Sequence, residues 1–237
     1  MEFIQTHSQY FAVLCGLIVG LPFIWIRRER IGIKRPIVVL GICLAYSVFS
    51  VFSALVFAAF EKLITGHSLM IGAISVLGVY LICPILLICF AKLSKVRLNG
   101  LFDCFAIYAC ISLVFMRINC LISGCCTGLM IPGLQTRYPV REIEILFYVL
   151  MIAWFLYKER KGYVEGMFFP FLMMAYGTLR FVLEWLRTAD TTSAFHLSHV
   201  WAIIAALIGI SLYFEIISRS KHSKSKHRRI RGGKAHV

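Results

Sequence analysis

Long apolar runs, separated by short polar and charged segments, dominate the chain. A bilayer core of about 30 Å is crossed by roughly 20 helical residues, and several runs approach that length. We expect membrane-spanning helices at residues 10–26, 37–60, 69–91, 101–123, 142–157, 163–184 and 199–217. The pattern therefore predicts an all-α, polytopic membrane protein with about seven transmembrane helices, forming a single domain over residues 1–217.

Basic residues alternate between the two sides of this predicted bundle. Nineteen of the 25 Lys and Arg residues fall in the connections after the first, third and fifth runs and in the tail, whereas four fall in the other connections. Because short basic loops stay on the cytoplasmic side, we expect the N-terminus outside and the C-terminus in the cytoplasm. We expect the polar, basic tail at 218–237 to be disordered and to lie near anionic membrane lipids.

Composition narrows the class of protein. Hydrophobic residues make up 60% of the chain and charged residues 15%, whereas a soluble domain is about half apolar and a quarter charged. This excludes a soluble domain, a disordered chain and a disulfide-stapled miniprotein. The formal charge of +14 could suggest a nucleic acid partner, but no aromatic residue interleaves the basic tail as a stacking platform requires. We therefore expect no nucleic acid partner.

Most of the nine cysteines lie inside apolar runs, where a thiol behaves as a small hydrophobe. Cys120, Cys125 and Cys126 differ, because they lie at the outer end of the fourth run. No second Cys/His cluster stands at zinc spacing, so we expect no metal site. A redox role stays open because the outer compartment can be oxidising. We favour close backbone packing of small residues between glycines.

Ionisable residues inside the predicted helices are the strongest candidates for function, because each costs about 2.5–3.5 kcal/mol on insertion scales. Tyr176, Arg180 and Glu184 are spaced four apart and share one helix face. A structural alternative is that Arg180 simply pairs with Glu184. Arg117 lies in the fourth run, about 21 Å of helix from Asp103, whose carboxylate would suit that helix's N-terminal dipole. We therefore expect Arg117 to lack a protein partner and to bind an anion such as a lipid phosphate, which a guanidinium matches bidentately.

His67 lies in the loop before the third run or at its start. A lone histidine usually has no catalytic role. In a lipid site, however, it could act as the base that deprotonates a nucleophile near neutral pH.

Five segments together carry a resemblance to a known family. They are RINCLISGCCTG from Arg117, YGTLRFVLEWLR from Tyr176, HSLMIG from His67, YPVREIE from Tyr138 and LSHVW from Leu197. Their order and spacing resemble the bacterial prolipoprotein diacylglyceryl transferases, whose patterns read approximately RIG(N/C)FxxGxxxG, YGxxRFxxExxR, HGGLIG, HPxQxYE and LSxxQ. The resemblance extends from about residue 60 to 217.

The resemblance implies a reaction at a bacterial plasma membrane. Members of the family transfer the diacylglyceryl group of phosphatidylglycerol to the lipobox cysteine of a prolipoprotein signal peptide, and glycerol phosphate leaves. The implied partners are therefore phosphatidylglycerol, prolipoprotein signal peptides and membrane lipids, with no cofactor. The catalytic residues implied by the matching motifs are His67 as base, Tyr176 to orient the phosphate and Arg180 to bind it.

The same motifs imply a substrate-binding set. Arg117 would hold the lipid head group, and Glu184 would orient Arg180. Gly128 would permit a tight turn closing the site. Cys120 stands where the family frequently has asparagine and would face the lipid, where an acyl or redox role is a further alternative.

The chain also departs from the family pattern. Asn119, Ser68 and Leu69 replace glycines, and the HPxQxYE segment keeps only Pro139 and Glu144. Three alternatives therefore stay open: a divergent or inactive relative that binds an anionic lipid, a small anion transporter with Arg117 and Arg180 lining its path, and a non-catalytic membrane scaffold.

Overall fold

The computed structural model describes the chain except for residues 1, 34, 66–74, 125, 188–196 and 234–237. Its helices are α1 (Glu2–Ile26), α2 (Arg28–Ile31), α3 (Pro36–Thr65), α4 (Val76–Leu81), α5 (Cys83–Ser94), α6 (Leu98–Ser123), α7 (Val140–Lys161), α8 (Phe168–Glu184) and α9 (Leu197–Gly233). Each predicted run overlaps one or two of these helices, which confirms the all-α class. The only extended pairings in the described ranges are two isolated bridges.

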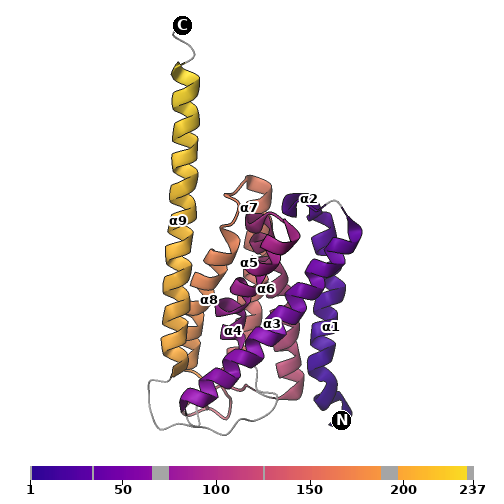
Figure 1. Cartoon of the computed structure of the whole chain (residues 1–237). Coiled ribbons are helices and arrows are strands. Elements are labelled where there is room, and N and C mark those ends of the chain that lie inside the picture. The colour runs from indigo at the N-terminus through magenta and orange to yellow at the C-terminus, as the bar shows by residue number, and fades with distance from the viewer. Residues whose placement is uncertain (1, 34, 66–74, 125, 188–196, 234–237) are drawn as a thin grey trace.

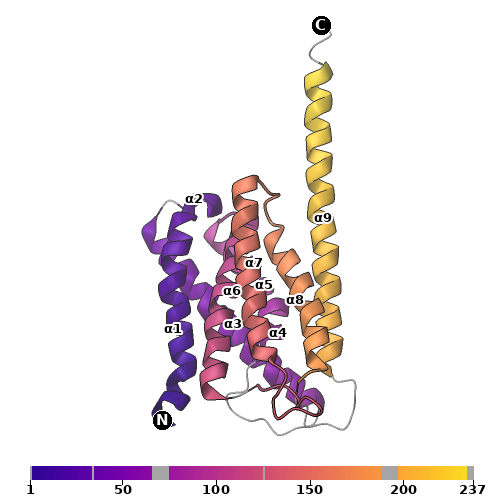
Figure 2. The ribbon, with the colours of Figure 1, turned by 180° about the vertical axis from the view of Figure 1, so that it is seen from behind.

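The helices run back and forth between two ends of the molecule (Figures 1 and 2). The short helix α2, the end of α7 and the long extension of α9 lie at one end, which we call the basic end. The N-terminus and the α6–α7 connection lie at the opposite end. The connections richest in Lys and Arg thus share one end, as the alternation of charge predicts.

Four described helical segments are long and apolar enough to cross a membrane, namely 37–64, 76–94, 98–123 and 197–222. This supports a polytopic membrane protein. The last apolar stretch of α1, Leu14–Ile26, is shorter, and α8 has 17 residues, equivalent to about 26 Å of helix. Several charged residues at both ends of α7 lower its hydropathy.

Two predicted boundaries differ from the structure for local reasons. The third run is divided into α4 and α5 at Ile82, because Pro84 has no amide hydrogen to donate to the carbonyl four residues earlier. The sixth run becomes helical only at Phe168. There Asp103 of α6 accepts hydrogen bonds from the backbone N–H groups of Gly166 at 2.7 Å and Phe168 at 3.0 Å. Asp103 therefore caps α8, and the prediction that it serves the start of its own helix is wrong.

The tail is a further difference. Where the sequence predicts disorder from residue 218, α9 continues as a helix to Gly233. No proline or glycine interrupts the sequence between Ser211 and Arg231, and Lys and Arg are good helix formers. At 37 residues, α9 is about 55 Å long.

Glycines bring two helix pairs into close contact. On α1, an added Cβ at Gly16 would lie 2.8 Å from Ser112 Oγ, and one at Gly20 would lie 2.1 Å from a ring carbon of Tyr108. On α8, a Cβ at Gly177 would meet the backbone of α9 at 2.7 Å. Small residues at such positions are the usual means by which membrane helices approach. These glycines allow α1 to pack closely against α6, and α8 to pack closely against α9.

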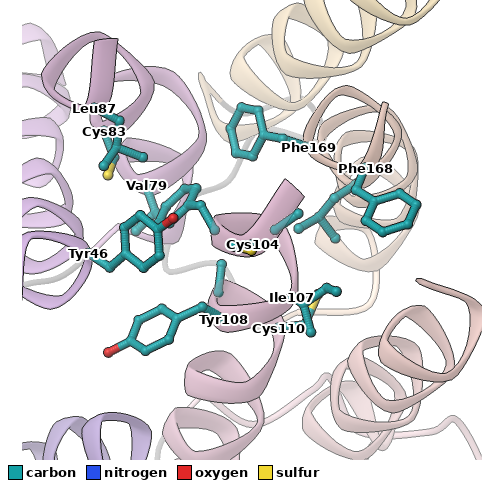
Figure 3. Packing of buried hydrophobic residues seen from close by; sticks show 14 of the residues in the cluster. Tyr46, Val79, Cys83, Leu87, Cys104, Ile107, Tyr108, Cys110, Phe168 and Phe169 are labelled. Carbon is teal, nitrogen blue, oxygen red and sulfur yellow. The ribbon is translucent and has the colours of Figure 1, made fainter. Parts of the chain in front are cut away.

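The core surrounds α6 (Figure 3). Side chains from α3, α4, α5 and α8 meet those of α6 there, and the Tyr46 hydroxyl donates to the Leu101 carbonyl at 2.6 Å. Cys83, Cys104 and Cys110 are almost fully buried in this cluster. This confirms that these thiols pack as small apolar groups.

Candidate functional site

Three helices bring the predicted ionisable residues together. Arg117 lies on α6, two turns before its end, and Arg180 and Glu184 lie in the last two turns of α8. The third helix, α7, adds Glu144 from its second turn. We call Arg117, Glu144, Arg180 and Glu184 the ion cluster. It lies toward the end of the molecule opposite the basic end.

Arg117 has a protein partner, so the prediction that it is unmatched is wrong. Its Nη2 donates to Glu144 Oε1 at 2.8 Å, and its Nε lies 2.6 Å from Glu144 Oε2. The Glu144 side chain is 1% exposed and that of Arg117 7%. Helices α6 and α7 are antiparallel neighbours, so a residue near the end of one meets a residue near the start of the other. The retained glutamate of the YPVREIE segment was the available signal for this partnership.

Arg180 lies between two carboxylates. Its Nη2 is 2.8 Å from Glu184 Oε2, and its Nη1 is 3.7 Å from Glu144 Oε1. The expected pairing of Arg180 with Glu184 is therefore confirmed. The cluster holds two arginines and two glutamates, so their formal charges balance.

Arg180 nevertheless retains unused donors. Its Nε and Nη1 are buried and make no hydrogen bond within the part of the chain that the structure describes. The side chain as a whole is 12% exposed. Buried polar groups are almost always hydrogen-bonded, so these two donors indicate that the site can bind a hydrogen-bond acceptor.

Tyr176 lies one turn from Arg180 and is 1% exposed. It interacts electrostatically with both Arg117 and Arg180. Its ring stacks on that of Tyr80 from α4, with centroids 4.4 Å apart. The structure thus brings Tyr176 to the ion cluster, as the sequence predicts.

Glu61 adds a further acidic group near the end of α3. It interacts with Ser75 and, through space, with Arg180 and Glu184. No motif pointed to it. In the sequence, Glu61 could have been recognised as a carboxylate at the end of a long apolar run.

Cys120 lies one turn beyond Arg117 and is almost buried, and its predicted role of facing the lipid stays a prediction. Its backbone carbonyl accepts a hydrogen bond at 3.2 Å from Nη1 of Arg141, on α7. Arg141 stands where the family pattern has glutamine. Cys120 and Arg141 therefore form the next layer outward from the Arg117–Glu144 pair.

Glycine is required at position 128 because the neighbouring backbone leaves no room for a side chain, and not because the chain turns there. Its φ angle is outside the left-handed region, which Gly124, Cys126 and Gly133 of the same connection adopt. A Cβ at Gly128 would lie 2.4 Å from the Tyr138 carbonyl oxygen. The neighbouring Leu129 amide donates to the Leu186 carbonyl at 2.8 Å. The predicted tight turn is wrong at Gly128 itself: the residue lets the α6–α7 connection pack against the end of α8.

Two predicted features lie outside the described residues. His67, the expected base, falls in 66–74, and Cys125 is also excluded. Their roles stay predictions. Cys126 lies within the described residues and is half-buried.

Comparison with known proteins gives one family. The family model of the prolipoprotein diacylglyceryl transferases matches residues 6–215. A search of curated proteins gives no match. The matched region contains the whole ion cluster and every residue of the predicted site.

Proposed function

We propose that this chain, which belongs to the prolipoprotein diacylglyceryl transferase family, transfers the diacylglyceryl group of phosphatidylglycerol to a cysteine thiol of a prolipoprotein. The family is a transferase family, and the helices support a membrane location. The specific donor and acceptor, and a bacterial inner membrane as the location, are parts of the proposal. So is the orientation that places the ion cluster toward the outer leaflet.

The observation that carries the proposal is the pair of unused donors on Arg180. Because Glu144 and Glu184 balance the two arginines, the cluster can stay charged in the membrane without a ligand. Among the described residues, the Nε and Nη1 groups of Arg180 still have no hydrogen-bond acceptor. A phosphodiester offers oxygens that match a guanidinium bidentately. Arg117 forms a close ion pair with Glu144, with one hydrogen bond from its Nη2, so it is better placed to support the cluster than to bind the ligand alone.

In the proposed reaction, negative charge develops on the leaving phosphate group, which we place beside Arg180. The acceptor thiol loses its proton to a base, and the thiolate forms a C–S bond to the glyceryl carbon that carries the phosphate. The C–O bond to the phosphate breaks, and glycerol phosphate leaves with the electron pair. Cationic donors fixed in a water-poor site stabilise the negative charge of this leaving group. The acceptor supplies its own thiol, so no cysteine of this chain is needed as nucleophile.

The other predicted residues complete the proposal. His67 is the proposed base for the acceptor thiol, whose pKa is ordinarily near 8.5. Tyr176 orients the phosphate beside Arg180, and Glu184 holds the arginine fork. Cys120 faces the head group beside Arg117. Gly128 allows the α6–α7 connection to close over this end of the site.

The test uses the full chain purified in detergent, labelled phosphatidylglycerol and a synthetic lipobox peptide. We expect a diacylglyceryl mass shift on the peptide cysteine. Arg180→Lys keeps the charge but removes the fork, so we expect transfer to fall by about 10²- to 10³-fold, as for loss of a preorganised donor. Arg219→Gln is the control, because Arg219 is exposed on α9.

Two results would contradict the proposal. One is full transfer by Arg180→Lys, which would remove Arg180 from the site. The other is no transfer by folded wild-type protein that still binds the labelled lipid. That result would favour a relative that binds an anionic lipid without performing the reaction.

A further inference from the structure

Three buried tyrosines form a layer beside the ion cluster. They come from different helices: Tyr80 from α4, Tyr148 from α7 and Tyr176 from α8. The rings of Tyr80 and Tyr176 are stacked with centroids 4.4 Å apart, and those of Tyr148 and Tyr176 with centroids 6.1 Å apart. Each residue is at most 1% exposed. Phenylalanine would provide the same stacking, so the hydroxyl groups require a separate explanation.

Two of these hydroxyls have at most each other as partners among the described residues. Those of Tyr80 and Tyr148 lie close enough to influence one another, yet neither makes a well-formed hydrogen bond within the described ranges. Other buried tyrosines are satisfied: Tyr46 donates to a backbone carbonyl and Tyr108 is hydrogen-bonded to Ser47. A buried hydroxyl without a well-formed hydrogen bond is destabilising, so the pair is suited to an acceptor that the described residues do not supply.

The layer has a defined depth relative to the ion cluster. Tyr148 follows Glu144 by four residues and Tyr176 precedes Arg180 by four. In both helices this step leads away from the end that carries the α6–α7 connection, by about 6 Å. The tyrosine layer is therefore on the membrane-interior side of the arginines.

A glycerophospholipid has the same order of groups. Its phosphate is nearest the water, its two acyl ester carbonyls follow a few bonds deeper, and its alkyl chains are deepest. Ester carbonyls accept hydrogen bonds and cannot donate them, whereas a tyrosine hydroxyl can donate. A donor lipid whose phosphate lies at Arg180 thus has its carbonyls at the depth of Tyr80 and Tyr148.

We propose that the hydroxyls of Tyr80 and Tyr148 bind the ester carbonyls of the donor lipid and so select diester over diether glycerophospholipids. The inference rests on the proposed function, because it takes the phosphate at Arg180 as its starting point. Holding the two carbonyls fixes the neighbouring glyceryl carbon at which the thiolate attacks. Helices α7 and α8 approach each other much less than α8 and α9, so side chains fill this interface.

The experiment compares dioleoyl phosphatidylglycerol with the dialkyl ether analogue of the same head group and chain length. Binding of each lipid to the full chain is measured by native mass spectrometry, and transfer to the lipobox peptide is measured separately. We expect wild-type protein to bind the diester at least tenfold more tightly. Tyr80→Phe and Tyr148→Phe should each bring the two affinities closer together. Tyr46→Phe, which loses a hydroxyl elsewhere in the core (Figure 3), should keep the wild-type ratio.

Equal binding of the two lipids by wild-type protein would overturn the inference without any variant. An unchanged ratio in both Tyr80→Phe and Tyr148→Phe would overturn it as well. Failure of the proposed function has a different signature, namely no peptide lipidation while the diester preference and its loss in the variants persist. The binding and transfer readouts therefore separate the two.

Discussion

Two regions of the molecule each combine arginine and glutamate side chains, but they differ in how completely the hydrogen bonds of these side chains are formed. At the basic end, Glu159 of α7 accepts hydrogen bonds from Arg27 Nε at 3.0 Å, Arg27 Nη2 at 2.6 Å and Arg30 Nη1 at 2.7 Å. Both carboxylate oxygens are used, and the Arg27 guanidinium lies 3.8 Å from the centre of the Phe23 ring. In the ion cluster, by contrast, Arg180 keeps two buried donors that have no acceptor among the described residues. Unsatisfied donors on Arg180 are thus what separates the ion cluster from the structural tie at the basic end.

The largest expected effect is at Glu144. Glu144→Gln leaves Arg117 buried beside an uncharged partner, and breaking a buried ion pair costs about 3–5 kcal/mol. We expect a marked drop in the thermal unfolding midpoint and in the yield of folded protein. Glu142→Gln is the matched control, because that neighbouring side chain is 47% exposed. If Glu144→Gln were as stable as wild type, Arg117 would not depend on this partner.

Gly128→Ala should have the next largest effect. The added methyl group would lie 2.4 Å from the Tyr138 carbonyl oxygen, and overpacking of this kind costs about 1–3 kcal/mol. We expect lower stability and slower lipid transfer, since the connection over the ion cluster must shift while all charges stay in place. Gly41→Ala is the control, because a Cβ there meets nothing within 4 Å. Equal effects of the two substitutions would exclude close approach as the reason for glycine at 128.

Glu159→Gln tests the structural tie at the basic end. Arg30 is 42% exposed and can be hydrated when the carboxylate is lost, so we expect destabilisation of about 1–2 kcal/mol. Transfer to the lipobox peptide should stay at the wild-type rate once the amount of folded protein is matched. A selective loss of transfer at unchanged stability would mean that this end takes part in the reaction.

The smallest effect is expected at an exposed pair on α9. Arg219 and Glu215 form an i,i+4 pair with side chains 79% and 51% exposed, and such pairs contribute about 0.3–0.5 kcal/mol. Glu215→Gln should therefore leave both the unfolding midpoint and transfer within experimental error of wild type. A large shift would show that α9 has a further contact at this position.

The sequence predicted well those features that depend on neighbours along the chain. Apolar runs located the helices, and the four-residue spacing of Tyr176, Arg180 and Glu184 predicted their common face. The Arg117–Glu144 pair was missed because it joins residues 27 apart on two helices, and its formation depends on how these helices are aligned. Gly128 was recognised as important for the wrong reason, since a backbone from a distant helix cannot be seen in a local motif. The tyrosine layer was missed for the same reason, because three helices must meet to form it.

The glycine contacts have a mechanical consequence. Gly16 and Gly20 hold α1 against α6, and Gly177 and Gly209 hold α8 against α9. These contacts bring two helix pairs close together, whereas α7 and α8 approach each other much less, and we call the α7–α8 interface the seam. The Arg117–Glu144 pair lies on one side of that seam, whereas the 3.7 Å approach of Arg180 to Glu144 crosses it. A shift of α8 against α7 would therefore change the surroundings of Arg180 first and leave the Arg117–Glu144 ion pair intact.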